Sequence, residues 1–384
     1  MRAIADIHRS TEQLTPCTPD INAVRRFCGR PRHRVAAALA FAAVACAVGA
    51  GRTFAAGPGD FEITIGNTMP YTGPAAAYGV IGKVIAGYFD KINAEGGING
   101  RKIKFISYDD GYNPAKTLEL TRKLVEEDKV LFTYAGLGTD PMATVQPYLN
   151  ANKIPQLFVA SGAAMWDRPR DFPWTTGFQP SYQAESHIYA EYLLENHPRG
   201  KIAILYQDDA FGKDYVKGLK DGLGGKIPIV AEAPYKVSDA TIDAQIARLK
   251  ASGADIFFDI STPKFAAMAI KRTAEVGWKP VHIISTVSSS ISAVMQPAGF
   301  QNAEGILSAA YTLQGEDPAM ANDPAYRDYN AFIDRYAPSA SKANSLTVYG
   351  YISARTMVEV LKKSGDDLSR ENIMSSSGFD PNGR

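Results

Sequence analysis

The sequence predicts an α/β fold with two parallel sheets, each carrying helices on both faces. The first observation is a regular alternation of short β-branched and aromatic segments with longer segments at helical spacing, which is typical of parallel βαβ units. The second is the number of such segments, because eight strands with their helices suit two doubly wound sheets better than one. The length of 384 residues also favours more than one packed unit.

Eight segments are predicted as buried strands because each is short, apolar and rich in β-branched or aromatic residues. They are 62–67, 102–108, 130–134, 156–159, 201–206, 228–231, 255–260 and 282–285.

Amphipathic spacing predicts helices between these strands. Residues 80–94 place Val80, Val84 and Tyr88 on one stripe. The other expected helices are 115–127, 184–196, 215–223, 242–251, 265–276, 325–336 and 346–363. Pro114 and Pro263 would stand in first helical turns, which agrees with these positions.

Two breaks interrupt the alternation. One lies near 172–181, where two prolines occur, and the other lies near 315–324, where the chain becomes polar. Patterning alone does not assign the two late helices to either sheet.

Residues 1–56 have the order of a leader with a secretory signal peptide. Basic residues at 30–34 precede an apolar run at 35–49, and small residues, including Ala55 and Ala56, follow it. The run is shorter than the roughly 20 residues of a transmembrane helix. All the cysteines lie in this leader: Cys17, Cys28 and Cys46. We therefore expect a thiol-free mature protein in the periplasm.

The charge balance excludes one class of partner. A formal net charge of +1 argues against nucleic-acid binding, which usually needs a basic excess. Beyond the leader, no apolar stretch is long enough to span a bilayer.

The loops after the predicted strands hold small residues, hydroxyls and aromatic rings rather than catalytic groups. Residues 136–138 lack the third glycine of a dinucleotide fingerprint, and neither a phosphate loop nor a Gly-x-Ser-x-Gly elbow occurs. The histidines beyond the leader fall outside these loops: His187, His197 and His282. We expect them to be structural. The predicted protein is not an enzyme and has no cofactor and no metal site.

The paired carboxylates Asp109–Asp110 and Asp208–Asp209 are interpreted as helix caps or as a solvated rim. Helix N-termini at the same loops offer backbone N–H groups to an anion such as a carboxylate. Tyr78, Tyr182 and Phe211 occupy strand-end loops or the expected lobe boundary, where a cleft would open.

Several stretches resemble type I periplasmic solute-binding proteins, in particular the leucine/isoleucine/valine-binding proteins of ABC importers. They are Thr-Gly-Pro…Tyr-Gly at 72–79, Ile-Asn-Ala-Glu-Gly-Gly-Ile-Asn-Gly-Arg at 92–101, Tyr-Asp-Asp at 108–110, and the similar stretches 209–215 and 349–351. The resemblance covers nearly all of the chain beyond the leader.

The resemblance implies the type I periplasmic binding protein fold, with two Rossmann-like lobes that close on one small-molecule solute. The first lobe would comprise 61–180 and 312–384, and the second 181–311. A non-catalytic monomer is implied, which passes its solute to an inner-membrane ABC permease. Family members usually continue several tens of residues further, which leaves two alternatives open: a truncated sequence, or a second lobe whose C-terminal end is incomplete.

The resemblance also implies ligand-binding residues. Tyr78 matches an aromatic residue that packs on the ligand, and Phe211 matches a tyrosine of the second lobe. The loops 136–138 and 161–164 match those that hold the ligand carboxylate. The full predicted set is Tyr78, Gly136, Leu137, Gly138, Ser161, Gly162, Ala163, Tyr182, Phe211, Thr262 and Val287.

Departures from the family pattern bear on the ligand. Gly136, Gly162 and Ala164 stand where amino-acid binders carry hydroxyls, and Val287 stands where they carry the glutamate that holds the ligand ammonium. Burying an ammonium without its counter-charge costs on the order of several kcal/mol. The stretches 172–174 and 261–267 are similar to the family branch that takes up aromatic acids.

The resulting hypothesis is an aromatic carboxylate, such as a hydroxycinnamate or a benzoate, held between Tyr78 and Phe211. Two alternatives stay open within this fold: a branched-chain amino acid binding protein, and a protein that senses its ligand rather than delivering it. An exported hydrolase is the third, and Ser161 has no histidine in a neighbouring loop to support it.

Overall fold

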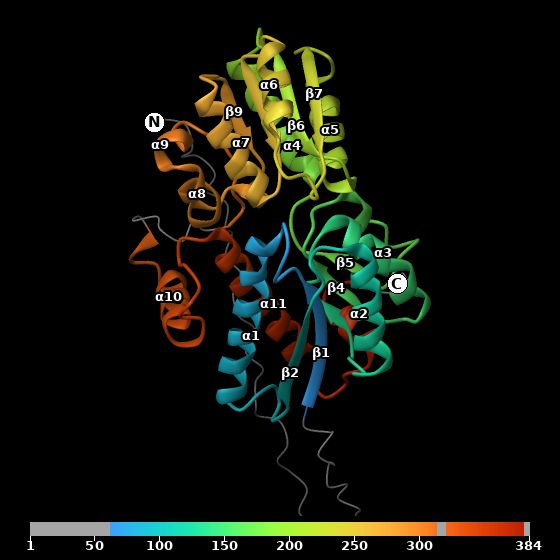
Figure 1. The fold of residues 1–384 in the computed structure, drawn as a ribbon. Helices are drawn as coiled ribbons and strands as arrows, with labels where there is room; N and C mark the ends of the chain where they lie inside the picture. The colour runs from blue at the N-terminus through green and yellow to red at the C-terminus, as the bar shows by residue number, and fades with distance from the viewer. Residues whose placement is uncertain (1–61, 313–319, 380–384) are drawn as a thin grey trace, which may run out of the picture. The chain divides into compact units, whose positions relative to one another are not determined.

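The computed structural model describes residues 62–312 and 320–379. The predicted leader, 1–56, and the extreme C-terminus lie outside the described residues. Two sheets form the centre, and every strand pair in them is parallel (Figure 1).

The first sheet has the strand order β2-β1-β3-β4-β5, and the second has the order β7-β6-β8-β9. The strands are β1 Glu62–Met69, β2 Lys102–Asp109, β3 Thr133–Tyr134, β4 Gln156–Val159, β5 Thr175–Gly177, β6 Ile202–Gln207, β7 Ile229–Tyr235, β8 Ile256–Ile260 and β9 Val281–Ile284. In each sheet the second strand in the chain pairs outside the first. Each sheet therefore has a switch point where the chain direction across the sheet reverses, and ligands collect beside such points at the strands' carboxyl ends.

Helices follow nearly every strand. They are α1 Gly79–Ala94, α2 Pro114–Glu126, α3 Thr139–Ala151, α4 Tyr182–Asn196, α5 Ala210–Leu223, α6 Asp243–Ala251, α7 Pro263–Glu275, α8 Gln296–Ala298, α9 Phe300–Ala303, α10 Pro324–Tyr336, α11 Ser345–Ser364 and α12 Arg370–Ser376. Short 3-10 turns occur at Ala76–Tyr78, Ala164–Trp166 and Thr286–Ser288. None of the described helices is both long enough and apolar enough to cross a membrane.

The first lobe consists of the five-stranded sheet and the helices that pack on it. α1 and α11 lie side by side, and α10 also contacts α1 (Figure 1). α1 and α11 approach closely at Gly350, where a Cβ atom would stand 3.0 Å from the Ile81 carbonyl oxygen. α12 packs on α11, and Arg370 donates a hydrogen bond to the carbonyl oxygen of Leu131 over 2.8 Å.

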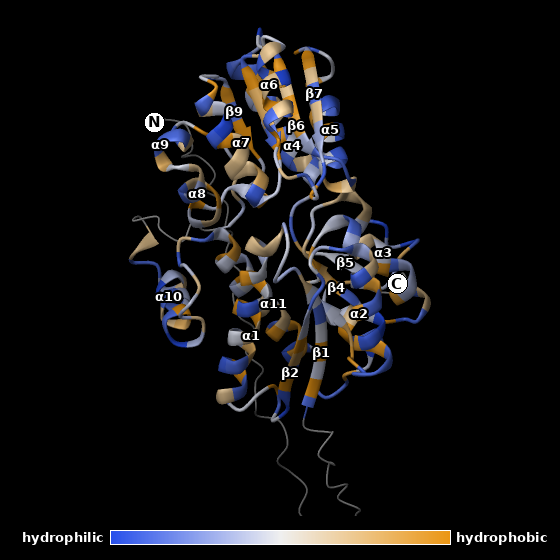
Figure 2. Ribbon diagram, in the orientation of Figure 1, coloured by the Kyte–Doolittle hydropathy of each residue, from blue (hydrophilic) through white to orange (hydrophobic). Residues whose placement is uncertain are grey.

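The second lobe consists of the four-stranded sheet with α4 and α5, which pack together, and with α6 and α7. One core contains Tyr189, Leu193 and Phe258, and the other contains Ala203, Ile246 and Phe257. Because β6 and β8 are buried on both faces, their residues are almost uniformly apolar, as Figure 2 shows for this sheet. The residue limits given above for the lobes stay a prediction.

The eight predicted strands are all present, with shifts of one or two residues at most ends and β3 limited to 133–134. The sequence analysis missed β5, which lies in the segment interpreted as a break, and it missed α3 and α12. β5 has only three residues. α3 carries Pro147 in its interior and buries Met142 and Val145, so its sequence shows little amphipathic contrast. α12 has seven residues, too few to display a helical period.

Candidate ligand-binding site

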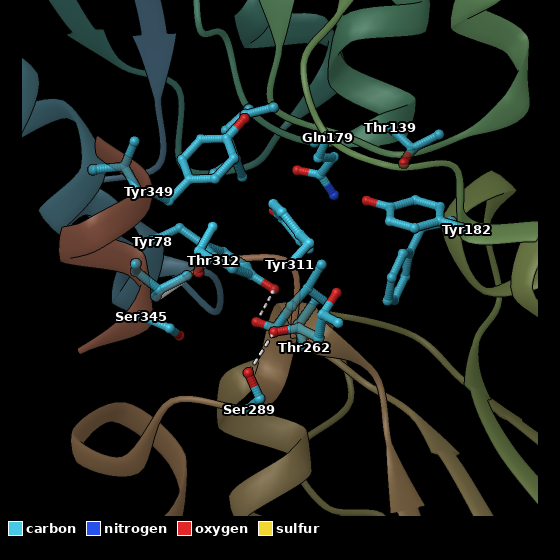
Figure 3. Close-up of a pocket in the computed structure, with 18 of the residues that line it drawn as sticks. Tyr78, Thr139, Gln179, Tyr182, Thr262, Ser289, Tyr311, Thr312, Ser345 and Tyr349 are labelled. Carbon is cyan, nitrogen blue, oxygen red and sulfur yellow. Dashed lines mark hydrogen bonds between the residues drawn. The ribbon is translucent and has the colours of Figure 1, made fainter. Parts of the chain in front are cut away.

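The carboxyl ends of both sheets face one cavity, which holds about 740 Å3 of empty space including its opening to solvent (Figure 3). The lining comes from loops and helix starts of both lobes: Tyr78, Ile81, Tyr112, Leu137, Gly138, Thr139, Ala160, Gln179, Tyr182, Phe211, Thr262, Thr286, Val287, Ser289, Ala309, Ala310, Tyr311, Thr312, Ser345, Leu346 and Tyr349.

Helix N-termini converge on this cavity because helices follow the strands at their carboxyl ends. Thr139, Tyr182 and Ser345 are the first residues of α3, α4 and α11. The N-termini of α4 and α11 are capped by side chains, those of Ser181 and Asn344.

The N-termini of α3 and α7, in contrast, are not capped by a side chain. The N-cap residue of α3 is Gly138, which has no side chain, and that of α7 is Thr262, whose hydroxyl makes no capping hydrogen bond. The Thr262 hydroxyl instead lies 3.3 Å from Oε1 of Gln207 and from the hydroxyl of Tyr235. Gly138 and Thr262 both line the cavity. Two helix starts there have first-turn N–H groups without a side-chain acceptor, and the partial positive charge at each start favours an anion.

The described lining is aromatic and uncharged. It contains no lysine, arginine, histidine, aspartate or glutamate among residues 62–312 and 320–379. The Phe211 ring packs edge-on against Tyr182, with centroids 5.3 Å apart, and Tyr215 stacks on Tyr182 at 4.5 Å. The Tyr78 hydroxyl donates to the carbonyl oxygen of Val287 over 3.4 Å, which connects the two lobes across the cavity.

Glu185 lies behind the cavity wall and is buried. Its two carboxylate oxygens accept from the backbone N–H of Thr286 (2.8 Å), the hydroxyl of Thr286 (2.7 Å), and the hydroxyls of Tyr189 (2.8 Å) and Tyr215 (2.7 Å). Burial raises the pKa of Glu185, and these four donors oppose the rise. Glu185 therefore fixes the turn that presents Thr286 and Val287 to the cavity, and its acceptors are occupied by the protein.

Asp209 lies at the start of α5, beside residues of the first lobe. Its carboxylate caps the N–H of Gly212 over 3.2 Å and accepts a short hydrogen bond from the Gln207 side-chain amide. The Ala210 N–H donates across the lobes to Oδ1 of Asp140 over 3.2 Å. Burial and, to a smaller extent, the nearby charge of Asp140 raise the pKa of Asp209 to about 6.

The structure brings seven of the predicted ligand-binding residues to the cavity lining. They are Tyr78, Leu137, Gly138, Tyr182, Phe211, Thr262 and Val287. Gly136, Ser161, Gly162 and Ala163 stand behind the lining. Their roles at the ligand stay a prediction.

These four residues have contacts within the protein. Ser161 Oγ and Thr139 Oγ1 are 2.8 Å apart, so Ser161 supports a residue that does line the cavity. A Cβ atom on Gly162 would meet the Pro180 carbonyl oxygen and the Tyr182 ring, and one on Gly136 would meet the Met142 sulfur. Ala163 packs in the apolar core. Gly162 is therefore needed for close packing of the loops behind the cavity, whereas the contact at Gly136 involves only the flexible Met142 side chain.

Several lining residues were missed by the sequence analysis, among them Tyr112, Gln179, Tyr311 and Tyr349. Tyr349 lies in a stretch that resembles the family, but at helical spacing it is indistinguishable from a core residue. Tyr311 and Thr312 follow the last strand by more than twenty residues. No local sequence signal places them at the cavity.

The histidines that we expect to be structural, His187, His197 and His282, are not among the residues that line the cavity. The His282 ring and the Asp259 carboxylate form a buried pair 3.3 Å apart, and Ser261 also donates to Asp259. Burial raises the pKa of Asp259, and the His282 pair opposes that rise. Within the described part of the chain, no group of three or more histidine, cysteine, aspartate or glutamate side chains could hold a metal ion.

Comparison with known proteins agrees with this geometry. The sequence profile of the periplasmic binding protein family matches residues 62–377. Leu/Ile/Val-binding protein homolog 1 of Brucella suis biovar 1 (strain 1330) is 24% identical over 321 residues, which cover 81% of each chain.

Two solved structures show the same fold. A substrate-binding periplasmic protein from Ralstonia solanacearum superposes with a TM-score of 0.75 at 22% identity, over 82% of this chain and 88% of that one. A solute-binding protein of an ABC transporter from R. palustris, in complex with 4-hydroxybenzoate, superposes with a TM-score of 0.71 at 18% identity, over 82% and 84% of the two chains.

Two parallel sheets with one cavity at their carboxyl ends define a bilobal solute-binding protein. The chain belongs to the periplasmic binding protein family, whose members are substrate-binding proteins rather than enzymes. This confirms the family and the fold predicted from the sequence.

Proposed function

We propose that this protein captures a small aromatic carboxylate in the periplasm and passes it to an inner-membrane ABC permease. Residues 1–56 would direct export and then be removed. The lobes would close on the ligand, and the closed form would be the one that the permease recognises. A hydroxycinnamate or a benzoate would be such a small aromatic carboxylate.

The observation that carries the proposal is an uncharged, aromatic cavity with an uncapped helix start on its wall. The first-turn N–H groups of α3 and the Thr139 hydroxyl would bind the ligand carboxylate, beside the predicted loop 136–138. Tyr78 and Phe211 would pack on the ring. α7, which starts after Thr262, offers a second anion-favouring helix start.

An α-amino acid fits this cavity less well, because its ammonium needs a counter-charge. Val287 is at the lining, as the sequence analysis expected, and it supplies none. The nearby carboxylates of Glu185 and Asp209 are engaged by protein donors. Burying the ligand ammonium without either carboxylate as a counter-charge would cost on the order of several kcal/mol of binding free energy.

The comparisons support the class and leave three ligand types in competition, the third being a fatty acid, after the fatty acid ABC transporter substrate-binding protein from Thermomonospora curvata. The R. palustris protein binds an aromatic acid, and the Brucella relative is named for branched-chain amino acids. The apolar lining residues Ile81, Leu137 and Leu346 would also suit an aliphatic side chain.

The test is a calorimetric and thermal-shift panel on the mature protein, with benzoate, 4-hydroxybenzoate and 4-hydroxycinnamate against leucine and valine. We expect saturable binding of at least one aromatic acid and no binding of the amino acids. A tight-binding ligand raises the free energy of unfolding by about 2.7 kcal/mol at a concentration of 100 Kd, so the shift is easily measured. Stabilisation by leucine and valine alone would overturn the proposal.

A further inference from the structure

The Tyr349 hydroxyl has no hydrogen-bond partner, although its side chain is 93% buried and lines the cavity. Among the described lining residues, it is the one whose buried side-chain polar atom lacks a partner. Tyr78, another buried tyrosine of the cavity, differs, because its hydroxyl donates to the carbonyl oxygen of Val287.

An unpartnered buried hydroxyl is costly, because it has lost its hydrogen bonds to water without gaining any in the protein. A ligand group that hydrogen-bonds to it recovers this free energy, whereas a ligand without such a group leaves the hydroxyl unpaired. A site built in this way rejects the analogue that lacks the polar group.

The Tyr349 ring is held in place by its surroundings. It packs edge-on against Phe178, with centroids 5.7 Å apart and an interplanar angle of 87°. Its helix, α11, is fixed to the first sheet by the hydrogen bond between Ser353 and Tyr134 (2.6 Å) and by the close approach of Gly350 to α1. The ring is therefore held in one position at the cavity wall. Burial raises the pKa of Tyr349 well above its ordinary value, so the hydroxyl keeps its proton and can donate.

The position of Tyr349 matters because it is across the cavity from the starts of α3 and α7. Figure 3 shows Tyr349 on one side of the cavity and Thr139 and Thr262 on other sides, with Tyr78 and Tyr311 between them. A planar ligand whose carboxylate faces α3 would direct its far end toward Tyr349.

We propose that Tyr349 is a specificity-determining residue that hydrogen-bonds a second polar substituent of the ligand, a ring hydroxyl at the end opposite the carboxylate. This inference rests on the proposed function, and it narrows the substrate class from aromatic carboxylates to hydroxylated ones.

The experiment compares ligand pairs that differ by one hydroxyl, benzoate with 4-hydroxybenzoate and cinnamate with 4-hydroxycinnamate. Titration calorimetry measures each Kd for the wild type, for Tyr349→Phe and for Tyr351→Phe. Tyr351 is the matched control, because it is also buried on α11 but packs against Tyr88 and Phe332 outside the cavity lining.

We expect the wild type to prefer the hydroxylated member of at least one pair about tenfold, which corresponds to 1.4 kcal/mol. Tyr349→Phe should lose this preference by weakening the hydroxylated ligand while leaving the other ligand's Kd within about twofold. Tyr351→Phe should keep the preference. The thermal unfolding of Tyr349→Phe should match or exceed that of the wild type, because the variant removes an unpaired buried group.

An equal loss for both members of a pair, or a wild type that does not distinguish them, would overturn this inference and leave the proposed function intact. Failure of every aromatic acid to bind the wild type would overturn the proposed function, and the inference with it.

Discussion

Asp209 shows how one residue combines a local role with a long-range one. Locally it is a helix cap, as the sequence predicted for the Asp208–Asp209 pair, since its side chain accepts from the N–H of Gly212. Its raised pKa has another origin, namely burial and the charge of Asp140, which is 69 positions earlier in the chain. The sequence shows the cap because a cap is local, and it does not show the second carboxylate.

This pKa predicts a pH dependence of stability with a definite sign. The pKa of Asp209 rises from about 3.9 in the unfolded chain to about 6 in the folded one. The folded state therefore holds the proton more tightly, and the stability contributed by Asp209 is fully present below pH 4 and is lost as the pH rises through 6.

Asp209→Asn keeps a capping side chain and removes the titration. We expect its free energy of unfolding, relative to the wild type, to increase by about 2 kcal/mol between pH 4 and pH 7, measured by denaturant unfolding. Asp208→Asn is the control, because the pairing with Lys213 lowers the pKa of Asp208 and gives the opposite slope. A parallel pH profile for wild type and Asp209→Asn would refute the assignment.

At the scale of an element, the turn into α3 depends on Gly138. Its backbone has φ 103° and ψ 143°, a conformation that is available essentially to glycine alone. A Cβ atom there would stand 2.5 Å from the Tyr112 ring, and both residues line the cavity. The turn therefore couples the helix start to the shape of the cavity.

Gly138→Ala should weaken both folding and ligand binding, because strain and the clash with Tyr112 displace the α3 start. We expect a loss of about 2–4 kcal/mol in unfolding free energy and a Kd raised at least tenfold. Gly253→Ala is the matched control. Gly253 also has a positive φ, 72°, but a Cβ atom meets nothing within 4 Å, so only about 1 kcal/mol is expected and binding should be unchanged. Equal effects of the two variants would contradict the coupling.

Elements were predictable where their own residues carry the signal. The buried strands β6 and β8 and the amphipathic helix α1 are such cases. α3 was missed because tertiary packing, between α2 and α5, buries it more than its pattern suggests. β5 was missed because pairing with β4, rather than its own three residues, makes it a strand.

For the whole molecule, the cavity depends on contacts between the lobes. The hydrogen bond from the Ala210 N–H to Asp140 joins the start of α5 to the start of α3, and the bond from Tyr78 to Val287 joins the two sides of the cavity. Under the proposed function, such contacts would favour the closed arrangement that holds a ligand.

Asp140→Ala removes one of these acceptors. We expect the Kd for the ligand to rise roughly fivefold, which corresponds to about 1 kcal/mol for one hydrogen bond. The pKa of Asp209 should also fall, because the charge that raises it is gone. Asp221→Ala, an exposed residue of α5 paired with Lys217, is the control and should bind as the wild type does. Unchanged or tighter binding by Asp140→Ala would show that the contact does not favour closure.

The sequence by itself determined the alternation of strands and helices, and it placed Tyr78 and Phe211 near a cleft, because strand ends and helix starts are local features that a parallel sheet gathers at one edge. The family resemblance, also carried by the sequence, added Val287. Tertiary structure alone decided which side chains face the cavity. Gly136 and Gly162 are outside the described lining, whereas Tyr349, which the pattern could not separate from the core, carries the one unpaired buried hydroxyl of that lining. The reason is physical: a residue's neighbours from distant segments determine whether its polar atom meets a partner or a ligand.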